Sequence, residues 1–491
     1  MENKITGGEG GWTMEFGNLF SWISLCLMVL LVFFERKDPK TLWAWLLVLT
    51  FMPAAGLLLY VLAGQNYRRK KLFHLKEMED ELQQTLAVQE RLMALPGKSV
   101  TEPEMAQFDS LIRYNLQAAD AVLTVDNRWE IFTEGKALYG ELTAQIRAAK
   151  TYIHILSYII RRDEVFAALE EELAEKAAEG VTVRLLVDAM GTRALGRRDY
   201  KRLRQKGIQV GIFFPAVLGR LQPRLNYRNH RKIIVVDGRV GFIGGFNIGR
   251  EYLGKDKKLG HWRDTHLKLT GSAALLLNVR FAQDWNYACR EDLFAQRALF
   301  APRAGDYQGH ALVQIIASGP DSRWQHIRNN YVRLFHGARK RIYIQTPYFV
   351  PDEAVLQALR MAALSGVDVR LMIPCKPDHP FVYRATCSYA GELLEAGARC
   401  FRYMDGFLHA KCVVVDGLAC CCGTANLDIR SFCLNFEVNA VIYDRALAGR
   451  MEEIFREDLK SCQEITREAY GKRGLGVRLG EQFSRLLSPI L

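Results

Sequence analysis

The hydrophobic and polar positions along the chain form three successive patterns. Near the N-terminus, two uncharged runs, residues 17–34 and 41–63, are separated by a short charged stretch. Each run is long enough to cross a bilayer as a helix, so the pattern predicts a two-helix transmembrane hairpin over residues 1–66. A signal peptide followed by a buried helix is the alternative, but the first run lacks a basic leader and a small-residue cleavage site. Pro53 lies in the second run, where a membrane helix tolerates a kink.

Beyond these runs, apolar residues recur at three- and four-residue spacing over residues 65–95, which is typical of a helix. The stripe consists of Leu72, Leu75, Met78, Leu82 and Leu86. The segment PGKSVTEP then interrupts the pattern. We therefore expect residues 67–125 to form a helical connector that lies on a membrane or on the remainder of the protein.

From about residue 125, short β-branched or aromatic runs alternate with helical stretches. The first three are TYIHILSYII (151–160), FAALEEELAEKAAEG (166–180) and VTVRLLVDA (181–189). Runs of this length in this order are typical of strands and helices that alternate along the chain. The alternation predicts an α/β fold.

The α/β part also repeats itself once, which predicts two similar halves, residues 126–305 and 306–491. The sharpest match joins HRKIIVVDGRVGFIGGFN (230–247) to HAKCVVVDGLACCCGTAN (409–426). Six matched positions share an offset of 179: His230 with His409, Lys232 with Lys411, Asp237 with Asp416, Gly244 with Gly423, Gly245 with Thr424, and Asn247 with Asn426. One such match is weak evidence, but two with the same continuation make an accidental recurrence very improbable.

The polar positions of the repeat suit chemistry on a phosphodiester. Within each copy the histidine and the lysine are two residues apart, so on an extended segment they share a face. The glycine-containing turn that follows brings the asparagine back beside them. If the halves pack about a pseudo-twofold axis, two imidazoles and two ammonium groups form one site. The lysines and asparagines then bind phosphate oxygens, while one neutral histidine attacks phosphorus and the other, protonated, donates to the leaving oxygen. Such a site needs no metal and no cofactor.

Charge and cysteine content narrow the setting. The net charge of +12 fits either nucleic acid or an anionic bilayer as a partner. The eleven cysteines show no zinc-site spacing, and Cys420, Cys421 and Cys422 read as part of a buried strand, which favours a reducing compartment. The segments on the terminal sides of the two runs contain more basic residues than the hairpin loop between the runs. This excess favours a cytoplasmic location for the catalytic body.

The paired motif resembles that of the phospholipase D superfamily, and its flanks are similar to bacterial cardiolipin synthases. The similar segments are residues 242–254, 261–271, 376–394, 406–411 and 426–439, together with the paired hydrophobic runs. The resemblance implies a multi-pass protein of the bacterial inner membrane. It also implies that two phosphatidylglycerols, drawn from an anionic lipid bilayer, give cardiolipin and glycerol through a phosphatidyl-histidine intermediate. Catalytic roles then fall on His230, Lys232, Asn247, His409, Lys411 and Asn426.

Four carboxylates accompany these residues. The motif aspartates Asp237 and Asp416 are included in the catalytic set as part of the matched pattern, but each lies beyond four strand residues from its lysine, so we expect them to hold a strand or turn rather than to perform chemistry. Glu437 and Asp264 are candidates for orienting the imidazoles, with a surface or structural role as the alternative. Their spacings from the motif asparagines differ, 11 and 17 residues, which weakens the equivalence.

Two further segments have open interpretations. The stretch 208–229 is longer than its counterpart in the second half, and its apolar and basic residues fit either a lipid-entry element or a longer packed loop; they include Phe213, Phe214, Leu218, Arg220 and Arg224. Asp378 and His379 are candidate headgroup contacts or structural residues. The C-terminal residues 471–491 fit an interfacial amphipathic helix or a core-packing helix.

Three rival functions stay open at this level. A membrane-tethered nuclease would use the same apparatus, but only the positive charge favours it, so we expect no nucleic-acid partner. A catalytically dead scaffold disagrees with two complete motifs. A hydrolytic phospholipase D or a phosphatidylserine-type synthase differs only in the acceptor. The sequence does not determine which histidine is the nucleophile, nor the oligomeric state.

Overall fold

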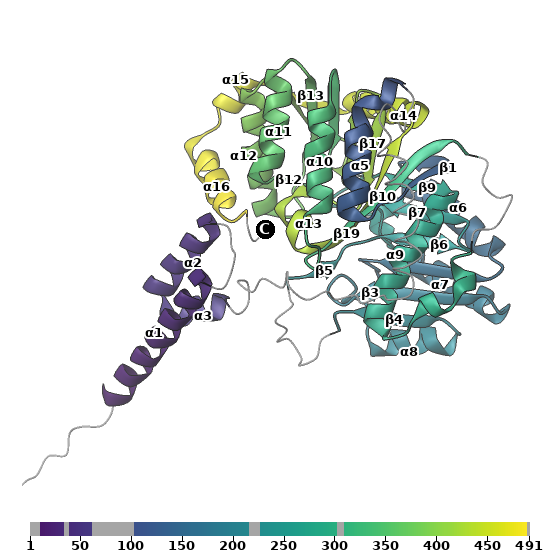
Figure 1. The fold of residues 1–491 in the computed structure, drawn as a ribbon, viewed down its shortest axis with the longest axis horizontal. Coiled ribbons are helices and arrows are strands. Elements are labelled where there is room, and N and C mark those ends of the chain that lie inside the picture. Colours follow the sequence, from purple (N-terminus) through teal and green to yellow (C-terminus); the bar gives the residue numbers. More distant parts are fainter. Residues whose placement is uncertain (1–9, 34–38, 61–102, 216–225, 302–308, 489–491) are drawn as a thin grey trace, which may run out of the picture. The chain divides into compact units, whose positions relative to one another are not determined.

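A computed structural model describes residues 10–33, 39–60, 103–215, 226–301 and 309–488. The chain divides into two compact units. One contains the N-terminal helices, and the other contains the α/β structure (Figure 1). The predicted stripe over residues 65–95 lies outside the described residues, and the bounds expected for the connector and the halves stay predictions.

The N-terminal unit is helical where it is described, with α1 (Gly10–Phe33), α2 (Pro39–Phe51) and α3 (Pro53–Leu59). Pro53 lacks a backbone N–H, and the second apolar run is accordingly divided at Met52. Leu31 and Leu49 are buried in the packing between these helices, and the Ser24 hydroxyl donates to the Pro53 carbonyl at 3.2 Å. Among the described residues, no helix is both long and apolar enough to cross a membrane, so the predicted membrane spans are not confirmed.

The first half of the α/β unit follows the expected alternation of strands and helices. Its elements are β1 (Leu123–Phe132), α6 (Gly135–Ala148), β2 (Tyr152–Ser157), α7 (Glu164–Ala178), β3 (Thr182–Asp188), α8 (Arg197–Gln205), β4 (Gln209–Phe213), β5 (Arg228–Asn229), β6 (Ile233–Val236), β7 (Val240–Gly244), β8 (Trp262–Arg263), β9 (His266–Thr270) and α9 (Ser272–Cys289).

The second half repeats this order with added elements at its C-terminal end. Its elements are β10 (Ala311–Ser318), α10 (His326–Gly337), β11 (Arg341–Gln345), β12 (Phe349–Val350), α11 (Glu353–Leu364), β13 (Asp368–Pro374), α12 (Pro380–Glu395), β14 (Arg399–Tyr403), β15 (Phe407–Leu408), β16 (Cys412–Val415), β17 (Ala419–Gly423), β18 (Leu427–Asp428), α13 (Ile429–Cys433), β19 (Asn435–Tyr443), α14 (Arg445–Leu459), β20 (Cys462–Ile465), α15 (Arg467–Gly471) and α16 (Leu475–Leu486).

The main sheet shows the pseudo-symmetry that the repeat predicts. Outward from its centre, the first half runs β1-β9-β7-β6-β2-β3-β4 and the second β10-β19-β17-β16-β11-β13-β14, with β20 at the edge. β1 and β10 join the halves as an antiparallel pair. Within each half, the strand that follows the motif lysine pairs antiparallel with an earlier strand of the same half. These pairs are β6 with β2 and β16 with β11. The predicted α/β fold with two similar halves is therefore confirmed in its topology.

Apolar positions along these elements form a core in each half. The segment η2 (Pro103–Phe108) and helix α5 (Asp109–Ala119), which precede β1, add Phe108 and Leu111 to the core of the second half rather than the first. Cys420, Cys421 and Cys422 are fully buried in β17, as their strand pattern predicts.

The long segment of the first half begins as core structure. Phe213 ends β4, its neighbour Phe214 follows it, and both rings pack against Phe436 of the second half. These two aromatic residues therefore serve as packing residues in the described structure, in agreement with the packed-loop interpretation. Leu218, Arg220 and Arg224 lie outside the described residues.

Candidate active site

The two motif histidines reach the site on segments that each half inserts against the other. β5, just before His230, pairs in parallel with the start of β19 in the second half. β15, just before His409, pairs in parallel with β8 in the first half. The His230 N–H donates to the Phe436 carbonyl at 2.9 Å, and the His409 N–H to the Arg263 carbonyl at 2.7 Å. The site is thus assembled by an exchange of strands between the halves.

Each imidazole is held by a carboxylate of the opposite half. His230 Nδ1 lies 3.0 Å from both carboxylate oxygens of Glu437. His409 Nδ1 lies 2.6 Å from Asp264 Oδ2. Both carboxylates are fully buried, whereas the histidine side chains retain about a tenth of their exposure, 12% and 10%. The structure therefore brings together all four of these predicted residues as two crossed pairs.

The strand register shows that the two carboxylates are equivalent despite their different spacing in the sequence. Gly244 pairs with His266 between β7 and β9, and Gly423 pairs with Asn439 between β17 and β19. Asp264 and Glu437 each lie two residues before the partner of the motif glycine. The longer first-half connection is accommodated before the carboxylate, so it leaves the register unchanged.

One motif position differs between the halves for a steric reason. A Cβ atom at Gly245 would meet Asp264 Oδ1 at 2.0 Å. At the matched position, Thr424 donates its hydroxyl to Glu437 Oε2 at 2.6 Å. The shorter aspartate thus goes with glycine, while the longer glutamate leaves room for a threonine that binds it.

The motif lysines lie beside their histidines, as the two-residue spacing predicts. Lys232 Nζ donates to the His230 carbonyl at 2.8 Å. Lys411 Nζ donates to the His409 carbonyl and lies 3.0 Å from His409 Nδ1. Both lysines are almost completely buried, at 3% and 1% exposure. Two cations are therefore held inside the protein, where their attraction for an anionic phosphate is weakly screened.

Burial governs the protonation of the site. It lowers the pKa of His230 and of His409 to about 4 each, although the carboxylates oppose this shift. Burial also lowers the pKa of Lys232 to about 7 and lowers that of Lys411. Burial alone would raise the pKa of Glu437, but His230 and Lys232 lower this pKa overall. The pKa of Asp264 is likewise lowered overall, against the effect of burial, by His409 and Lys411. The site at neutral pH therefore holds neutral imidazoles against ionised carboxylates.

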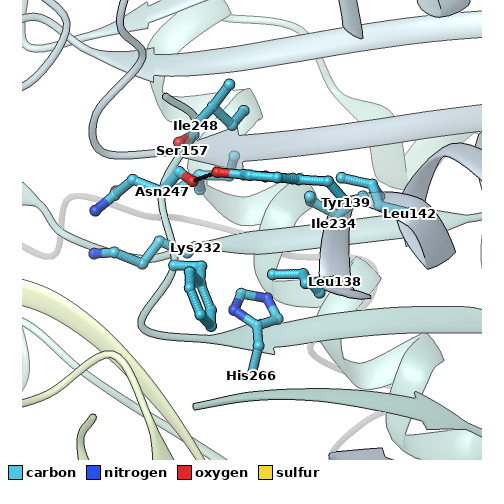
Figure 2. A pocket seen from close by; sticks show the side chains of 11 residues that line it. Leu138, Tyr139, Leu142, Ser157, Lys232, Ile234, Asn247, Ile248 and His266 are labelled. Atoms are coloured by element: carbon cyan, nitrogen blue, oxygen red, sulfur yellow. Dashed lines mark hydrogen bonds between the residues drawn. The ribbon is translucent and has the colours of Figure 1, made fainter. Parts of the chain in front are cut away.

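The motif asparagines hold the loops behind the site. Asn247 accepts from the Ile159 N–H at 3.1 Å and donates to the Tyr252 hydroxyl at 3.1 Å. Figure 2 shows the Lys232 ammonium and the Asn247 amide pointing the same way, on side chains that line one small pocket. Asn426 donates to Asp428 at 3.2 Å, while its own side-chain oxygen is buried without a partner. The predicted return of Asn247 towards the lysine is confirmed by this arrangement.

The motif aspartates do not reach the imidazoles. Asp237 accepts backbone N–H groups from Lys150, Thr151 and Tyr152 at 2.7–2.9 Å. Asp416 accepts from Arg339, Lys340 and Arg341 at 2.7–2.8 Å. Both aspartates have positive φ angles, 53° and 57°. These contacts agree with the strand or turn role that the distance from the lysine indicated, because each aspartate ties a hairpin turn to the start of a neighbouring strand.

Two aromatic residues beside the histidines were not singled out from the sequence. The Tyr158 ring lies edge-on to His230 with centroids 4.8 Å apart. Trp262 lies 5.0 Å from the His409 ring, and its indole N–H donates to Asp264 at 3.3 Å. Both belong to segments that stood out in the sequence, the repeated strand and the HWRD stretch, and that is the signal that would have found them.

A buried ion pair next to the site was also not anticipated. Arg231, between the motif histidine and lysine, donates to Asp284 of α9 and to the carbonyls of Glu437 and Ser318. Arg231 thus connects the first-half motif to the second half.

Of the candidate headgroup contacts, Asp378 accepts from the Tyr348 hydroxyl, whereas the His379 side chain is 69% exposed.

Comparisons with known proteins agree with this site. The family model described as cardiolipin synthase, phospholipase D-like domain, matches residues 142–285 and 331–459. The phospholipase D-nuclease N-terminal model matches residues 20–65. The cardiolipin synthase of Listeria innocua is 45% identical over 96% of this chain and 100% of its own length.

Two further relatives and one solved structure extend this result. The major cardiolipin synthase of Bacillus subtilis is 45% identical over 96% of this chain and 98% of its own length, and the Staphylococcus aureus cardiolipin synthase is 44% identical over 96% and 95%. The phosphatidylserine synthase of Haemophilus influenzae has a TM-score of 0.58 at 16% identity, covers 78% of this chain and 100% of its own, and shows the fold. The chain therefore belongs to the cardiolipin synthase family and is a phosphatidyltransferase of the phospholipase D type.

Proposed function

We propose that the protein transfers a phosphatidyl group from one phosphatidylglycerol to the hydroxyl of a second, forming cardiolipin and releasing glycerol. The observation that carries this proposal is the crossed pair of histidine–carboxylate contacts. Each carboxylate accepts the Nδ1 proton of a neutral imidazole, which leaves Nε2 of the ring with a lone pair. Two such imidazoles supply a nucleophile and an acid–base group for a two-step exchange.

In the first step we assign the attack on phosphorus to His230 Nε2. The only side-chain partners of His230 Nδ1 in the described structure are the two oxygens of Glu437, so the ring tautomer with a free Nε2 is well defined. His409 protonates the departing glycerol oxygen. Its 2.6 Å contact with Asp264 is of the length expected for a charge-assisted bond, which stabilises an imidazolium when the anionic substrate is bound.

In the second step the roles of the groups reverse. His409, now neutral, takes the proton from a headgroup hydroxyl of the second phosphatidylglycerol. The resulting oxygen nucleophile attacks the phosphorus of phosphatidyl-His230, the P–N bond breaks, and cardiolipin leaves. The free His230 and the protonated His409 then stand ready for another donor. This sequence balances atoms and protons without a metal or a cofactor.

Positive charge around the phosphate is assigned to Lys232 and Lys411, with Asn247 and Asn426 as further donors. Burial makes the interaction of the ammonium groups with developing negative charge stronger than in water. The influence of Lys411 on the pKa of His230, and of Lys232 on that of His409, supports a single shared phosphate position between the halves.

The substrates also support a location at the bacterial inner membrane. The match of residues 20–65 to an N-terminal family model and the two uncharged runs support an anchoring role for α1 and α2 as a multi-pass segment. The unpaired cysteines and the distribution of basic residues support a cytoplasmic catalytic body.

The test is to incubate the detergent-solubilised protein with phosphatidylglycerol as the sole lipid, in the presence of a chelator, and to analyse lipids and water-soluble products. Cardiolipin and glycerol in equal amounts are expected. Phosphatidic acid in place of cardiolipin would assign a hydrolase, and cleavage of DNA without lipid turnover would assign a nuclease.

His230→Ala and His409→Ala should each abolish this turnover, whereas His379→Ala, which removes an exposed imidazole, should not. Lipid adducts that are trapped by rapid denaturation at mildly alkaline pH, where the P–N bond survives, and located by mass spectrometry should lie on His230. An adduct on His409 would reverse the assigned roles of the two histidines while leaving the two-step exchange intact.

A further inference from the structure

Helix α16 packs against the protein with its polar side. Glu481, Ser484 and Ser488 are 4%, 0% and 3% exposed. Glu481 pairs with Arg473. Arg485 pairs with Glu392 of α12, and Ser488, just beyond the end of α16, contacts the Tyr389 hydroxyl of α12. Figure 1 shows α16 beside α12, with which it is in contact. Neither a simple core-packing helix nor a solvent-facing helix has this arrangement.

The opposite side of α16 is apolar and open. Leu475, Leu479, Phe483 and Leu486 are 73%, 62%, 57% and 79% exposed. Spacings of four, four and three residues place these side chains in one stripe along the helix. Four large apolar side chains aligned in this way are unfavourable in water, so the stripe marks a surface with a partner.

The surroundings of the stripe are basic. Over residues 467–488 the sequence contains five arginines or lysines and two glutamates. Three of these cations form ion pairs, Lys472 with Glu468, Arg473 with Glu481 and Arg485 with Glu392. The excess positive charge belongs to Arg467 and Arg478, which are exposed and donate to backbone carbonyls. An apolar stripe bordered by cations is complementary to a leaflet of anionic lipid, whereas a second copy of this basic segment would bring like charges together.

The position of α16 relates the stripe to the active site. α16 lies against the first half of α12 at Gly480, where an added Cβ atom would meet the Arg384 side chain at 3.4 Å. The first half of α12 in turn binds β12, where the Thr386 hydroxyl accepts the Phe349 N–H at 3.0 Å. β12 pairs with β18, which directly follows Asn426. The Gly480 region of α16 therefore packs against the part of α12 that is joined, through β12 and β18, to the catalytic loop of Asn426.

We propose that α16 is an interfacial helix whose apolar stripe inserts into an anionic leaflet and seats the catalytic opening on the bilayer that supplies both lipids. This inference rests on the proposed function for its substrate. Phe381, in the first turn of α12, is also exposed, at 48%, and precedes by three residues the Arg384 that lies against Gly480. The polar contacts with α12 hold the stripe outward.

The first test uses the full chain with a photoreactive amino acid at position 479, reconstituted in vesicles of phosphatidylglycerol. Lipid adducts are expected at this position. The matched control is position 364 at the end of α11, where the leucine is 73% exposed against 62% for Leu479. It lies just before β13 begins, and so at the opposite end of that strand from the loop that leads into α12. Adducts to a second protein chain, or lipid adducts that are equal at both positions, would overturn the proposal.

The second test compares two substrates with the Leu479→Ser/Phe483→Ser variant. Its kcat/KM on phosphatidylglycerol vesicles should fall about tenfold, because two apolar contacts with the leaflet are lost, while the rate on dispersed short-chain phosphatidylglycerol should be unchanged. Leu364→Ser should affect neither rate. Equal losses on both substrates would contradict an interfacial role. Absence of cardiolipin from the unmodified protein would refute the proposed function instead, and the adduct experiment would still decide the role of α16.

Discussion

Asp264 and Glu437 hold equivalent positions with side chains that differ by one methylene, and the residue across the turn differs to match. Gly245 leaves space for the aspartate, whereas Thr424 binds the glutamate. The difference indicates that the position of the carboxylate oxygens, rather than the identity of the residue, is what the site requires. It also explains why the matched motif shows glycine in one half and threonine in the other.

Gly245→Thr should therefore displace Asp264 and tilt His409, since the added Cβ would lie 2.0 Å from a carboxylate oxygen. We expect kcat to fall about a hundredfold, the usual cost of misplacing a catalytic group by about 1 Å. Thr424→Gly removes a hydrogen bond but no space, so its effect should be much smaller. Initial rates of cardiolipin formation compare the two variants, and equal losses would contradict the steric explanation.

The buried Lys232 predicts a pH limit on substrate binding. Its pKa of about 7 means that the free enzyme loses this ammonium as pH rises through neutrality. His230, with a pKa of about 4, is already neutral there. We expect the loss of this cation to lower kcat/KM above about pH 7. In Lys232→Arg the cation persists, so the alkaline fall should move to higher pH even if the maximum is lower; an unchanged profile would exclude Lys232 as its source.

At the scale of elements, the strongest connections are made by side chains that bind backbone. Asp237 and Asp416 each receive three consecutive N–H groups at the start of β2 or β11, and so fix the β6–β7 and β16–β17 hairpins to the neighbouring strands. Because the motif lysines lie just before β6 and β16, these ties also determine where the catalytic segments begin.

Asp237→Asn should lower the free energy of unfolding by about 1–3 kcal/mol, because charge-assisted bonds to backbone are lost. Backbone and Thr151 hydrogen bonds, which outweigh burial, lower the pKa of Asp237 in the folded protein. Its contribution is therefore present at neutral pH and is lost as pH falls through the folded-state pKa. Urea unfolding should show a difference from the parent protein that shrinks towards acid pH. Glu457→Gln, at an exposed carboxylate, should show none of this.

Element prediction succeeded where local pattern and tertiary packing agree. The run TYIHILSYII forms β2, and the stretch rich in alanine and glutamate forms α7. The prediction was incomplete where the packing partner determines which core an element joins or which of its faces is buried. Helix α5 joins the core of the second half although it precedes the first in the sequence, and the C-terminal helix has its polar face inward. Periodicity indicates that a helix has two faces but not which one meets the protein.

At the scale of the whole molecule, the two halves are joined through the site itself. Strands β5 and β15 cross between halves, and Arg231 carries a buried charge from the first-half motif to carbonyls of the second. Substrate chemistry and domain association therefore depend on the same few residues.

Arg231→Met should destabilise the protein by about 3–5 kcal/mol, because it leaves the buried Asp284 carboxylate without its cation. Arg231→Met/Asp284→Asn removes both charges and should recover most of the loss. Thermal unfolding measures the stability, and limited proteolysis of the parent and variants reports separation of the halves. A double variant no more stable than the single one would show that the ion pair is not the source of the effect.

The repeat in the sequence was sufficient to predict two α/β halves and the histidine, lysine and asparagine set, because strands of similar pattern fold alike and a shared offset of 179 aligns their polar residues. The crossing of carboxylates between halves, the backbone groups that Asp237 and Asp416 bind, and the positions of Tyr158 and Trp262 became clear only in three dimensions. Local spacing determines which side chains share a face of one strand. Contacts between strands distant in the chain depend on register and packing, which no local pattern records.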